Sequence, residues 1–152
     1  MRSLVAADAA QVALLVRRAF SHQSVATDPP PSALRETAEN VAAILDAGGG
    51  AGIEADGAIV AAVLWQPKPP GLYVGRLAVD PAHRRRGHAR ALIAAAEAAA
   101  RDGGHKLLWL STRLTLHDNR KLFASCGFVE TAQHAHPGYA APTFVDMQKP
   151  LR

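Results

Sequence analysis

The stretch from Asp80 to Ala89, Asp-Pro-Ala-His-Arg-Arg-Arg-Gly-His-Ala, has the residue types of a phosphate cradle. Gly87 has no side chain and Ala89 has a small one, so the backbone at both positions can approach a ligand closely. A helix that begins here would add unpaired N–H groups and the positive end of its dipole. Arginine side chains can add charge-assisted hydrogen bonds. The stretch therefore predicts an anion-binding site.

Two other phosphate-binding motifs fit this stretch poorly. A P-loop is disfavoured because no Gly-Lys-Ser or Gly-Lys-Thr follows and no acidic magnesium ligand is apparent. A dinucleotide-binding fingerprint is disfavoured because the first glycine of Gly-x-Gly-x-x-Gly is missing.

Composition favours one domain, 1–152, with a localised positive charge. A chain of 152 residues buries roughly two-thirds of the surface that its unfolded form exposes. The net charge of +4 and the pI of about 9.7 suit an anionic ligand, either a phosphorylated cofactor or a nucleic acid. The basic residues form no long tail, and their densest run is Arg84, Arg85, Arg86 and Arg90. A local site is therefore the better interpretation.

The single cysteine, Cys126, excludes an intramolecular disulfide and a cysteine-based metal cage, and fits a reducing compartment. We expect Cys126 to be a small buried residue rather than a nucleophile. The first residues lack the apolar core of a signal peptide, and no apolar run reaches about 18 residues. We therefore expect a cytoplasmic protein without a membrane partner.

Helical patterns dominate the first third of the chain. Apolar residues over 8–20 recur at helical spacing, with Asp8 as the predicted N-cap and Gln11 as its capping-box partner. Residues 21–31 end in three prolines and predict a loop. Ser32 is the predicted cap of a second helix, which ends at the glycines of 48–50.

Strand patterns lead to the cradle. Residues 53–65 predict a β-hairpin with its turn at Asp56-Gly57, and 72–79 predict the next strand. A helix over 89–101 and an apolar strand over 106–112, covered on both faces, would then complete a parallel βαβ unit.

The remaining residues predict one more helix, 116–125, and a closing pair of strands, 128–133 and 143–149, around a loop over 134–142. The order of elements predicts a single α/β domain whose mixed sheet contains a parallel βαβ unit flanked by helices.

Three motifs together resemble one known family. Arg84-x-x-Gly87-x-Ala89 matches the acetyl-coenzyme A binding loop of the GNAT superfamily of N-acetyltransferases, and 77–81 is similar to the strand and turn that precede that loop. Asn119-x-x-Leu-Phe-x-x-x-Gly-Phe is similar to the family segment Asn-x-x-Leu-Tyr-x-x-x-Gly-Phe. Together with the order of elements, the resemblance covers nearly the whole chain and implies the GNAT fold.

The resemblance implies acetyl-coenzyme A (acetyl-CoA) as cosubstrate. Backbone groups of Leu77 and Val79, on either side of Ala78, would pair with the pantetheine arm, and Asn119 would reach that arm with its amide. The amides of the loop would hold the pyrophosphate, and the implied residues are Arg85, Arg86, Gly87, His88 and Ala89. Side chains that would neutralise the phosphates are Arg84, Arg85 and Arg90.

The implied reaction is direct attack by a neutral amine on the thioester. The Val79 amide would stabilise the oxyanion. Where many members of the family have a tyrosine as the acid, this chain has Phe123, which can pack against the thioester but cannot donate a proton. Tyr139 and Ser125 are candidate substitutes. The candidates for the general base are Glu54, Tyr73, His134 and His136.

The loop over 134–142 is a candidate substrate-facing segment, because it carries two histidines that titrate near neutral pH and an aromatic ring. His134-x-His136 has no acidic or cysteine partner nearby in the sequence, so we expect no metal. Residues that could line the rim of the substrate pocket are Arg35, Glu36, Glu39 and Asn40.

The favoured function is therefore acetyl transfer from acetyl-CoA to a primary amine of a small molecule. Two alternatives remain open: an amine of a protein or an aminoacyl-tRNA, and a non-catalytic acetyl-CoA-binding module. A nucleic-acid partner is disfavoured because the cofactor would use the arginines that create the charge. Exposed strand edges at the end of the chain would permit a homodimer.

Overall fold

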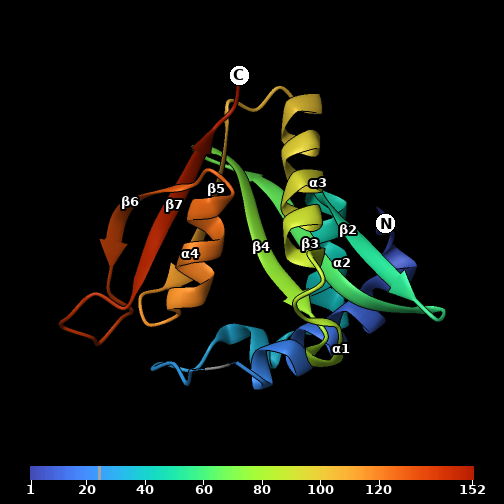
Figure 1. The fold of residues 1–152 in the computed structure, drawn as a ribbon, viewed down its shortest axis with the longest axis horizontal. Coiled ribbons are helices and arrows are strands. Elements are labelled where there is room, and N and C mark those ends of the chain that lie inside the picture. The colour runs from blue at the N-terminus through green and yellow to red at the C-terminus, as the bar shows by residue number, and fades with distance from the viewer. Residues whose placement is uncertain (24) are drawn as a thin grey trace.

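A seven-stranded mixed sheet organises the chain (Figure 1). The computed structural model describes residues 1–23 and 25–152; Ser24, in the predicted loop 21–31, lies outside the described residues. The strands are β1 (Arg2–Ser3), β2 (Gly49–Ala55), β3 (Ala58–Lys68), β4 (Gly71–Val79), β5 (Leu107–Arg113), β6 (Val129–His134) and β7 (Phe144–Pro150). The α-helices are α1 (Ala9–Ser21), α2 (Ala38–Ala47), α3 (His88–Asp102) and α4 (His117–Ser125). Short 3₁₀ turns are η1 (Ala6–Asp8), η2 (Ser32–Arg35) and η3 (Pro81–His83).

The strand order is β1-β2-β3-β4-β5-β7-β6, and β4 and β5 are the parallel neighbours. This arrangement confirms the predicted mixed sheet with a parallel βαβ unit. At one edge of the sheet β1 has only two residues, and at the other β6 has a register shift between Glu130 and Ala132.

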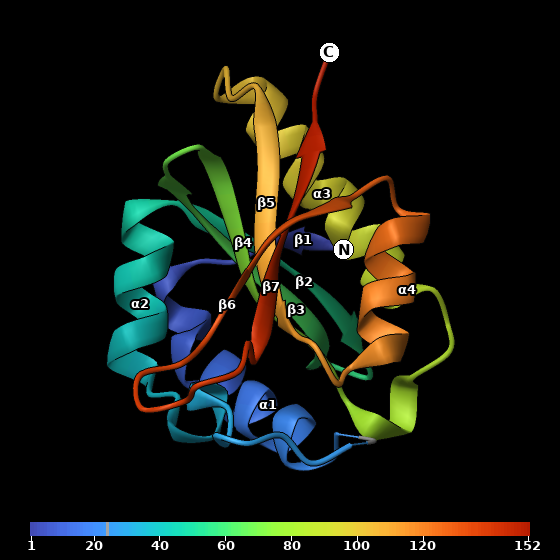
Figure 2. The same ribbon diagram turned by 90° about the vertical axis from the view of Figure 1, so that its left-hand side faces the viewer.

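Two hydrophobic cores lie on the two faces of the sheet. Helices α1 and α2 cover one face, and α3 and α4 cover the other (Figure 2). Because side chains alternate along a strand, Ala61 and Val63 of β3 join the α3 core while Ala62 and Leu64 join the α1 core. The strand covered on both faces is therefore β3. The expectation that β5 has this character was wrong, because its alternate residues are only half-buried.

Strands β4 and β5 pair over a short length and then separate. Their paired residues are Leu72 with Leu108 and Tyr73 with Trp109. At the end where the two strands pair, a Cβ atom on Gly71 would lie 2.2 Å from the Leu107 carbonyl oxygen, so the close approach of the strands requires glycine. Beyond Tyr73 the two strands diverge and leave a gap in the sheet.

A β-bulge in β4 changes which side chains face each core. One extra residue of β4 lies opposite β3 between the pairs Ala62–Ala78 and Leu64–Gly75. Within the bulge Arg76 has φ of 53°, a left-handed conformation that is uncommon for a residue with a side chain. As a result, Ala78 joins the α1 core whereas Leu77 and Val79 pack against the α3 core.

Several local predictions hold. The hairpin turns at Asp56-Gly57 with φ of 53° and 81°, as a tight primed turn requires. The four helices and the last pair of strands are confirmed, with ends shifted by a few residues; the second helix differs most.

Asp8 is the N-cap residue of α1, as predicted, but its side chain makes no capping hydrogen bond, and the predicted capping box with Gln11 and the Ser32 cap were wrong. The Asp8 carboxylate accepts hydrogen bonds from Arg2 and from the Val5 N–H, and Gln11 accepts one from the Ile59 N–H of β3. Ser32 begins η2, whereas α2 begins at Ala38 and is capped by Thr37. Near α1, contacts with residues distant in sequence replace the expected capping hydrogen bonds. Before α2, a 3₁₀ turn occupies the residues where the helix was expected to begin. In the part of the chain that the structure describes, no helix has the length and apolar character needed to cross a membrane.

Replacing Leu92 by Ala should test the α3 core. Leu92 is fully buried, so the cavity should lower the free energy of unfolding by about 2–5 kcal/mol. Leu14 on α1 is 60% exposed, and Leu14→Ala should cost less than about 0.5 kcal/mol. Urea unfolding of the two variants would measure the difference, and equal costs would contradict the assignment of the core.

Candidate functional site

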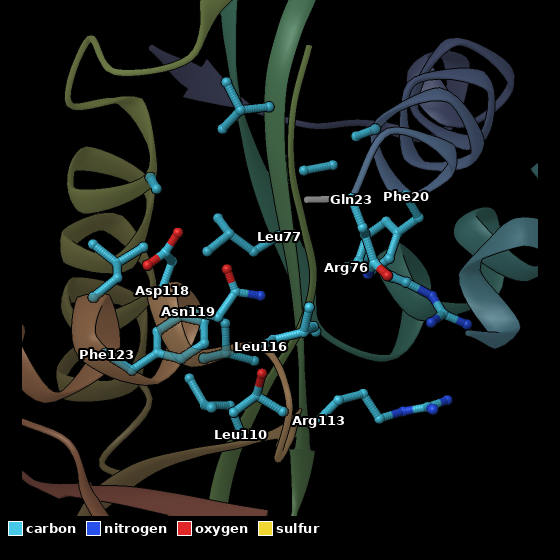
Figure 3. Close-up of a pocket in the computed structure, with 18 of the residues that line it drawn as sticks. Phe20, Gln23, Arg76, Leu77, Leu110, Arg113, Leu116, Asp118, Asn119 and Phe123 are labelled. Atoms are coloured by element: carbon cyan, nitrogen blue, oxygen red, sulfur yellow. The ribbon is translucent and has the colours of Figure 1, made fainter. Parts of the chain in front are cut away.

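A cavity of about 790 Å³ opens where β4 and β5 part. Its walls are β4 and β5, the turn before α3, α4, the end of α1 and the start of β7. Figure 3 shows Asn119 and Phe123 reaching from α4 on one side of β4, with Arg76 and Phe20 on the other. The cavity therefore passes through the plane of the sheet.

The edge of β4 offers unpaired backbone groups to this cavity. The Asp80 N–H donates to the Val60 carbonyl on β3 at 2.7 Å. Since successive N–H groups of a strand point to opposite edges, the N–H groups of Val79 and Leu77 point away from β3 and into the gap. The predicted backbone positions thus lie along the wall of the cavity.

The turn before α3 offers further free amides. Among the described residues, none accepts a hydrogen bond from the backbone N–H groups of 85–89. Arg85 and Gly87 have φ of 63° and 80°. A Cβ atom on Gly87 would meet nothing within 4 Å, so the space beside this glycine is open. These N–H groups and the N-terminal end of α3 have the chemistry that an anion-binding site requires, and binding of an anion here stays a prediction.

The arginines of the turn have different roles. The Arg84 guanidinium group donates to the carbonyl oxygens of His22 at 2.9 Å and Ala19 at 3.0 Å, and so holds the C-terminal end of α1. Arg86 lies 3.3 Å from His83 Nδ1, and Arg90 lies 3.8 Å from Cys126 Sγ. Arg85, Arg86 and Arg90 are exposed. A contact of the Arg84 side chain with phosphate therefore stays a prediction, since its terminal nitrogens are engaged with α1.

On α4, Phe123 and Asn119 both line the cavity. Phe123 is buried and contacts Phe128 edge to face, with ring centroids 6.1 Å apart. Asn119 is exposed and, like Leu77, lines the cavity (Figure 3). Cys126, expected to be buried, is half-buried beside Arg90.

The opposite side of β4 contains a polar network centred on Glu36. Its carboxylate accepts hydrogen bonds from Arg76 Nε at 2.6 Å, from Asn40 Nδ2 at 2.6 Å and from the Thr37 N–H at 3.0 Å. Its side chain is 1% exposed. Burial acts to raise the pKa of Glu36, but the hydrogen bonds from Asn40 and Arg76 outweigh it and leave the pKa below its usual value. Glu36, predicted for the rim, therefore lies beneath Arg76 and orients it.

Arg113 and His136 complete this side of the cavity. Arg113 donates to the carbonyl oxygens of Pro29 and Pro30, and burial lowers the pKa of its guanidinium group. His136 is held by the Thr143 hydroxyl through Nδ1 and through its backbone N–H. Burial and the nearby charge of Arg113 lower the pKa of His136 below its usual value. The imidazole is therefore neutral at neutral pH.

Of the six candidate acid and base residues, only Tyr73 and His136 line the cavity. Burial raises the pKa of Tyr73, so its hydroxyl stays protonated. The other four have partners elsewhere: Glu54 pairs with Arg2, His134 with Asp146, Ser125 with the Leu122 carbonyl, and Tyr139 donates to Asp28 at 2.6 Å. The sequence analysis did not include Arg76 or Arg113 among the candidate site residues. Arg113 could have been found, because a charged residue at the end of a strand that is otherwise largely apolar indicates a functional position.

Comparison with known proteins agrees with this geometry. The sequence matches the acetyltransferase (GNAT) family over residues 13–128. No curated protein matches the sequence. The chain therefore belongs to the GNAT acetyltransferase family, as the fold and the split sheet indicate.

Solved structures share the fold. The yncA protein from Salmonella typhimurium, solved with its cofactor acetyl-CoA, is 19% identical with a TM-score of 0.76, over 99% of this chain and 92% of that one. The ribosomal-protein-S18-alanine N-acetyltransferase from Escherichia coli is 22% identical with a TM-score of 0.76, over 98% and 91%. An acetyltransferase from Bacillus subtilis, in complex with CoA, is 16% identical with a TM-score of 0.63, over 75% and 84%.

Replacing Glu36 by Gln should destabilise the protein at pH 7 by about 1–3 kcal/mol, because it weakens charge-assisted hydrogen bonds in a buried site. Since folding lowers the pKa of Glu36, its carboxylate stabilises the fold above its unfolded pKa. That contribution is lost as pH falls through the folded pKa. Urea unfolding between pH 7 and pH 3 would measure this effect: the free energy of unfolding of the wild type should approach that of the variant at low pH.

The exposed Glu39, in the first turn of α2, provides the control. Glu39→Gln should change the free energy of unfolding by less than about 1 kcal/mol. A Glu36→Gln variant that keeps the same stability as wild type at pH 7 would contradict the role of the network.

Proposed function

We propose that this protein is an acetyl-CoA-dependent N-acetyltransferase that acetylates a primary amine of a small molecule by direct attack in a ternary complex. The observation that carries the proposal is the gap between β4 and β5. It leaves the amides of Leu77 and Val79 without a partner strand, on the wall of a cavity that the turn with the free amides of 85–89 also lines. Membership of the GNAT acetyltransferase family supports it, as do structural neighbours that contain acetyl-CoA or CoA.

The residues present fit acetyl-CoA. The free amides of 85–89 and the open space beside Gly87 suit a pyrophosphate, which needs close backbone approach. The β4 edge at Leu77 and Val79 suits the amide groups of a pantetheine arm. Asn119 can hydrogen-bond that arm, and Phe123 can pack against its sulfur end. When bound, acetyl-CoA supplies the thioester whose carbonyl carbon the amine attacks.

The chemistry needs few groups from the protein. The amine nitrogen forms a bond to the acetyl carbon, and the carbon–sulfur bond breaks. The Val79 N–H can donate to the carbonyl oxygen as that oxygen gains negative charge. Phe123 cannot protonate the departing sulfur, and the Tyr139 hydroxyl is already donating to Asp28. The thiolate therefore leaves without an acid from these residues and takes its proton from water.

His136 is the proposed general base. It lines the cavity, and its Nδ1 is held by the Thr143 hydroxyl, which leaves Nε2 to accept a proton. Its lowered pKa keeps it unprotonated at neutral pH. Tyr73, the other candidate that lines the cavity, has a raised pKa and is the weaker proton acceptor.

Contacts between two loops favour a small acceptor. The Tyr139–Asp28 hydrogen bond joins the loop between β6 and β7 to the segment after α1, and Arg113 donates to carbonyl oxygens of that same segment. The two segments lie side by side in Figure 2. These contacts tie the two segments together on the side of the cavity away from α4, and an acceptor that must pass between tied segments is more easily a small molecule than a folded protein.

Thiol release from acetyl-CoA, measured across a panel of small amines and short peptides, would test the proposal. Calorimetry would measure acetyl-CoA binding separately. Reaction with small amines is the expected result. Reaction confined to peptides would favour a protein acceptor, and tight binding without thiol release would favour a non-catalytic module; either result would replace the proposal.

Replacing Gly87 by Val should lower the affinity for acetyl-CoA at least tenfold, about 1.4 kcal/mol, because the side chain would enter the pyrophosphate space. Gly104→Val is the matched control, since Gly104 also has a positive φ, 74°, and open space around its Cβ position. Both variants should carry similar backbone strain. Calorimetry should find the loss of acetyl-CoA affinity only in the Gly87→Val variant. If the two variants bind acetyl-CoA equally well, this turn is not part of the binding site.

Replacing His136 by Asn should lower kcat/KM by about 10²-fold or more, the usual contribution of a general base. In wild type, activity should fall as pH drops through the lowered pKa of His136, that is, below about pH 6.5. The variant should lack this limb of the profile. If the variant keeps the same loss of activity at acidic pH as the wild type, the general base is another group.

A further inference from the structure

We propose that the acceptor amine carries an anionic group, a carboxylate in particular, which binds between Arg76 and Arg113. This inference rests on the proposed acetyltransferase function and names the class of its acceptor. Neither arginine belongs to the motifs that carry the resemblance to the family.

The two arginines lie on the same side of the cavity. Arg76 comes from the bulge of β4 and Arg113 from the last residue of β5, so the divergence of the two strands places one on each wall. Figure 3 shows both guanidinium groups on the side of β4 away from Asn119 and Phe123. They are therefore separate from the residues proposed to hold acetyl-CoA.

Both side chains are held in place but retain free donors. A guanidinium group has five N–H donors in a planar fork. Arg76 uses Nε and Nη2 toward Glu36 and Ser32, and Arg113 uses Nη1 and Nη2 toward Pro29 and Pro30. Nη1 of Arg76 and Nε of Arg113 have no partner among these contacts. A planar carboxylate suits such donors, and little side-chain entropy is lost because both groups are already oriented.

The charge around the two arginines favours an anion. Among the described residues that line the cavity, Asp118 is the only one with a carboxylate, and it lies on α4 (Figure 3). Glu36 forms an ion pair with Arg76, and Asp28, whose charge acts on Arg113, accepts a hydrogen bond from the Tyr139 hydroxyl. Arg113 is half-buried, and the hydrogen bonds of its side chain go only to neutral carbonyl groups. A partly buried cation of this kind gains most from an anionic ligand.

Space for the rest of the acceptor lies beside Arg76. A second hollow of about 570 Å³ shares Arg76, Tyr73 and Ser32 with the main cavity. Its other walls include apolar side chains of α2 and β3, such as Ile44 and Leu64. An amino acid with an apolar side chain would fit this combination of an anion site and an apolar hollow.

Thiol release with matched acceptor pairs would test the inference. Each pair is an amino acid and its primary amide: phenylalanine and phenylalaninamide, leucine and leucinamide, β-alanine and β-alaninamide. The amide keeps the shape but removes the charge. Its amine is less basic, so more of it is neutral, and the comparison is biased against the proposal. Aminoalkylphosphonates distinguish a phosphoryl group from a carboxylate.

The expected result is that at least one amino acid exceeds its amide at least tenfold in kcat/KM. Arg113→Gln should lower the value for that amino acid at least tenfold more than the value for its amide, because both reactions share the effect of Arg113 on His136 but only the amino acid has the carboxylate. The affinity for acetyl-CoA should be nearly unchanged. Arg113→Lys should restore part of the preference, because it keeps the charge but not the fork. Arg101→Gln is the control; Arg101 lies at the far end of α3 and pairs with Glu97.

The outcomes separate this inference from the proposed function. If amides react as well as amino acids, the anion site is wrong and the acetyltransferase function stands. If Arg113→Gln lowers both members of a pair equally, Arg113 only supports the loop and the inference is again wrong. If phosphonates alone react, the anion site stands and the carboxylate is wrong. If no amine releases thiol, the proposed function fails and this inference fails with it.

Discussion

The structure depends on the incomplete pairing of β4. This strand is bonded to β3 along nearly its whole length, but it meets β5 only at two residue pairs. A backbone N–H that is buried without a partner costs free energy, so the gap between the strands is stable only if water or a ligand satisfies its edge. An extended molecule with amide groups could satisfy this edge as a neighbouring strand does.

The closed end of the gap is held by side-chain packing. Tyr73 and Trp109 form an edge-to-face pair with centroids 4.7 Å apart, and Lys68 lies 5.1 Å and 5.6 Å from their centroids. Trp109 Nε1 also donates to the Lys68 carbonyl at 2.8 Å. These contacts act on both strands at once. They fix the point at which β4 and β5 part, and therefore the position of the cavity along the sheet.

The sequence predicted the fold and the backbone of the site better than its side chains. Periodic apolar residues decide helix or strand locally, and a turn such as Asp56-Gly57 requires a particular backbone conformation. The hydrogen bonds of Glu36 with Arg76, Arg84 with Ala19 and Tyr139 with Asp28 join residues 40 to 111 positions apart, and such pairs follow from topology rather than from local pattern. The positive φ of Arg76 is a further case, because a bulge depends on pairing with β3 and leaves no signature at the arginine itself.

The placement of the unpaired β4 edge also bears on how the protein avoids aggregation. An exposed strand edge can recruit a strand from another molecule, and proteins limit this with short, charged or bulged edge strands. Here the outermost strands are the two-residue β1 and the bulged β6, which carries Glu130 and His134. The edge that could accept a long partner is instead enclosed between β4 and β5. It can be reached by a narrow flexible molecule and is shielded from the strand of another protein.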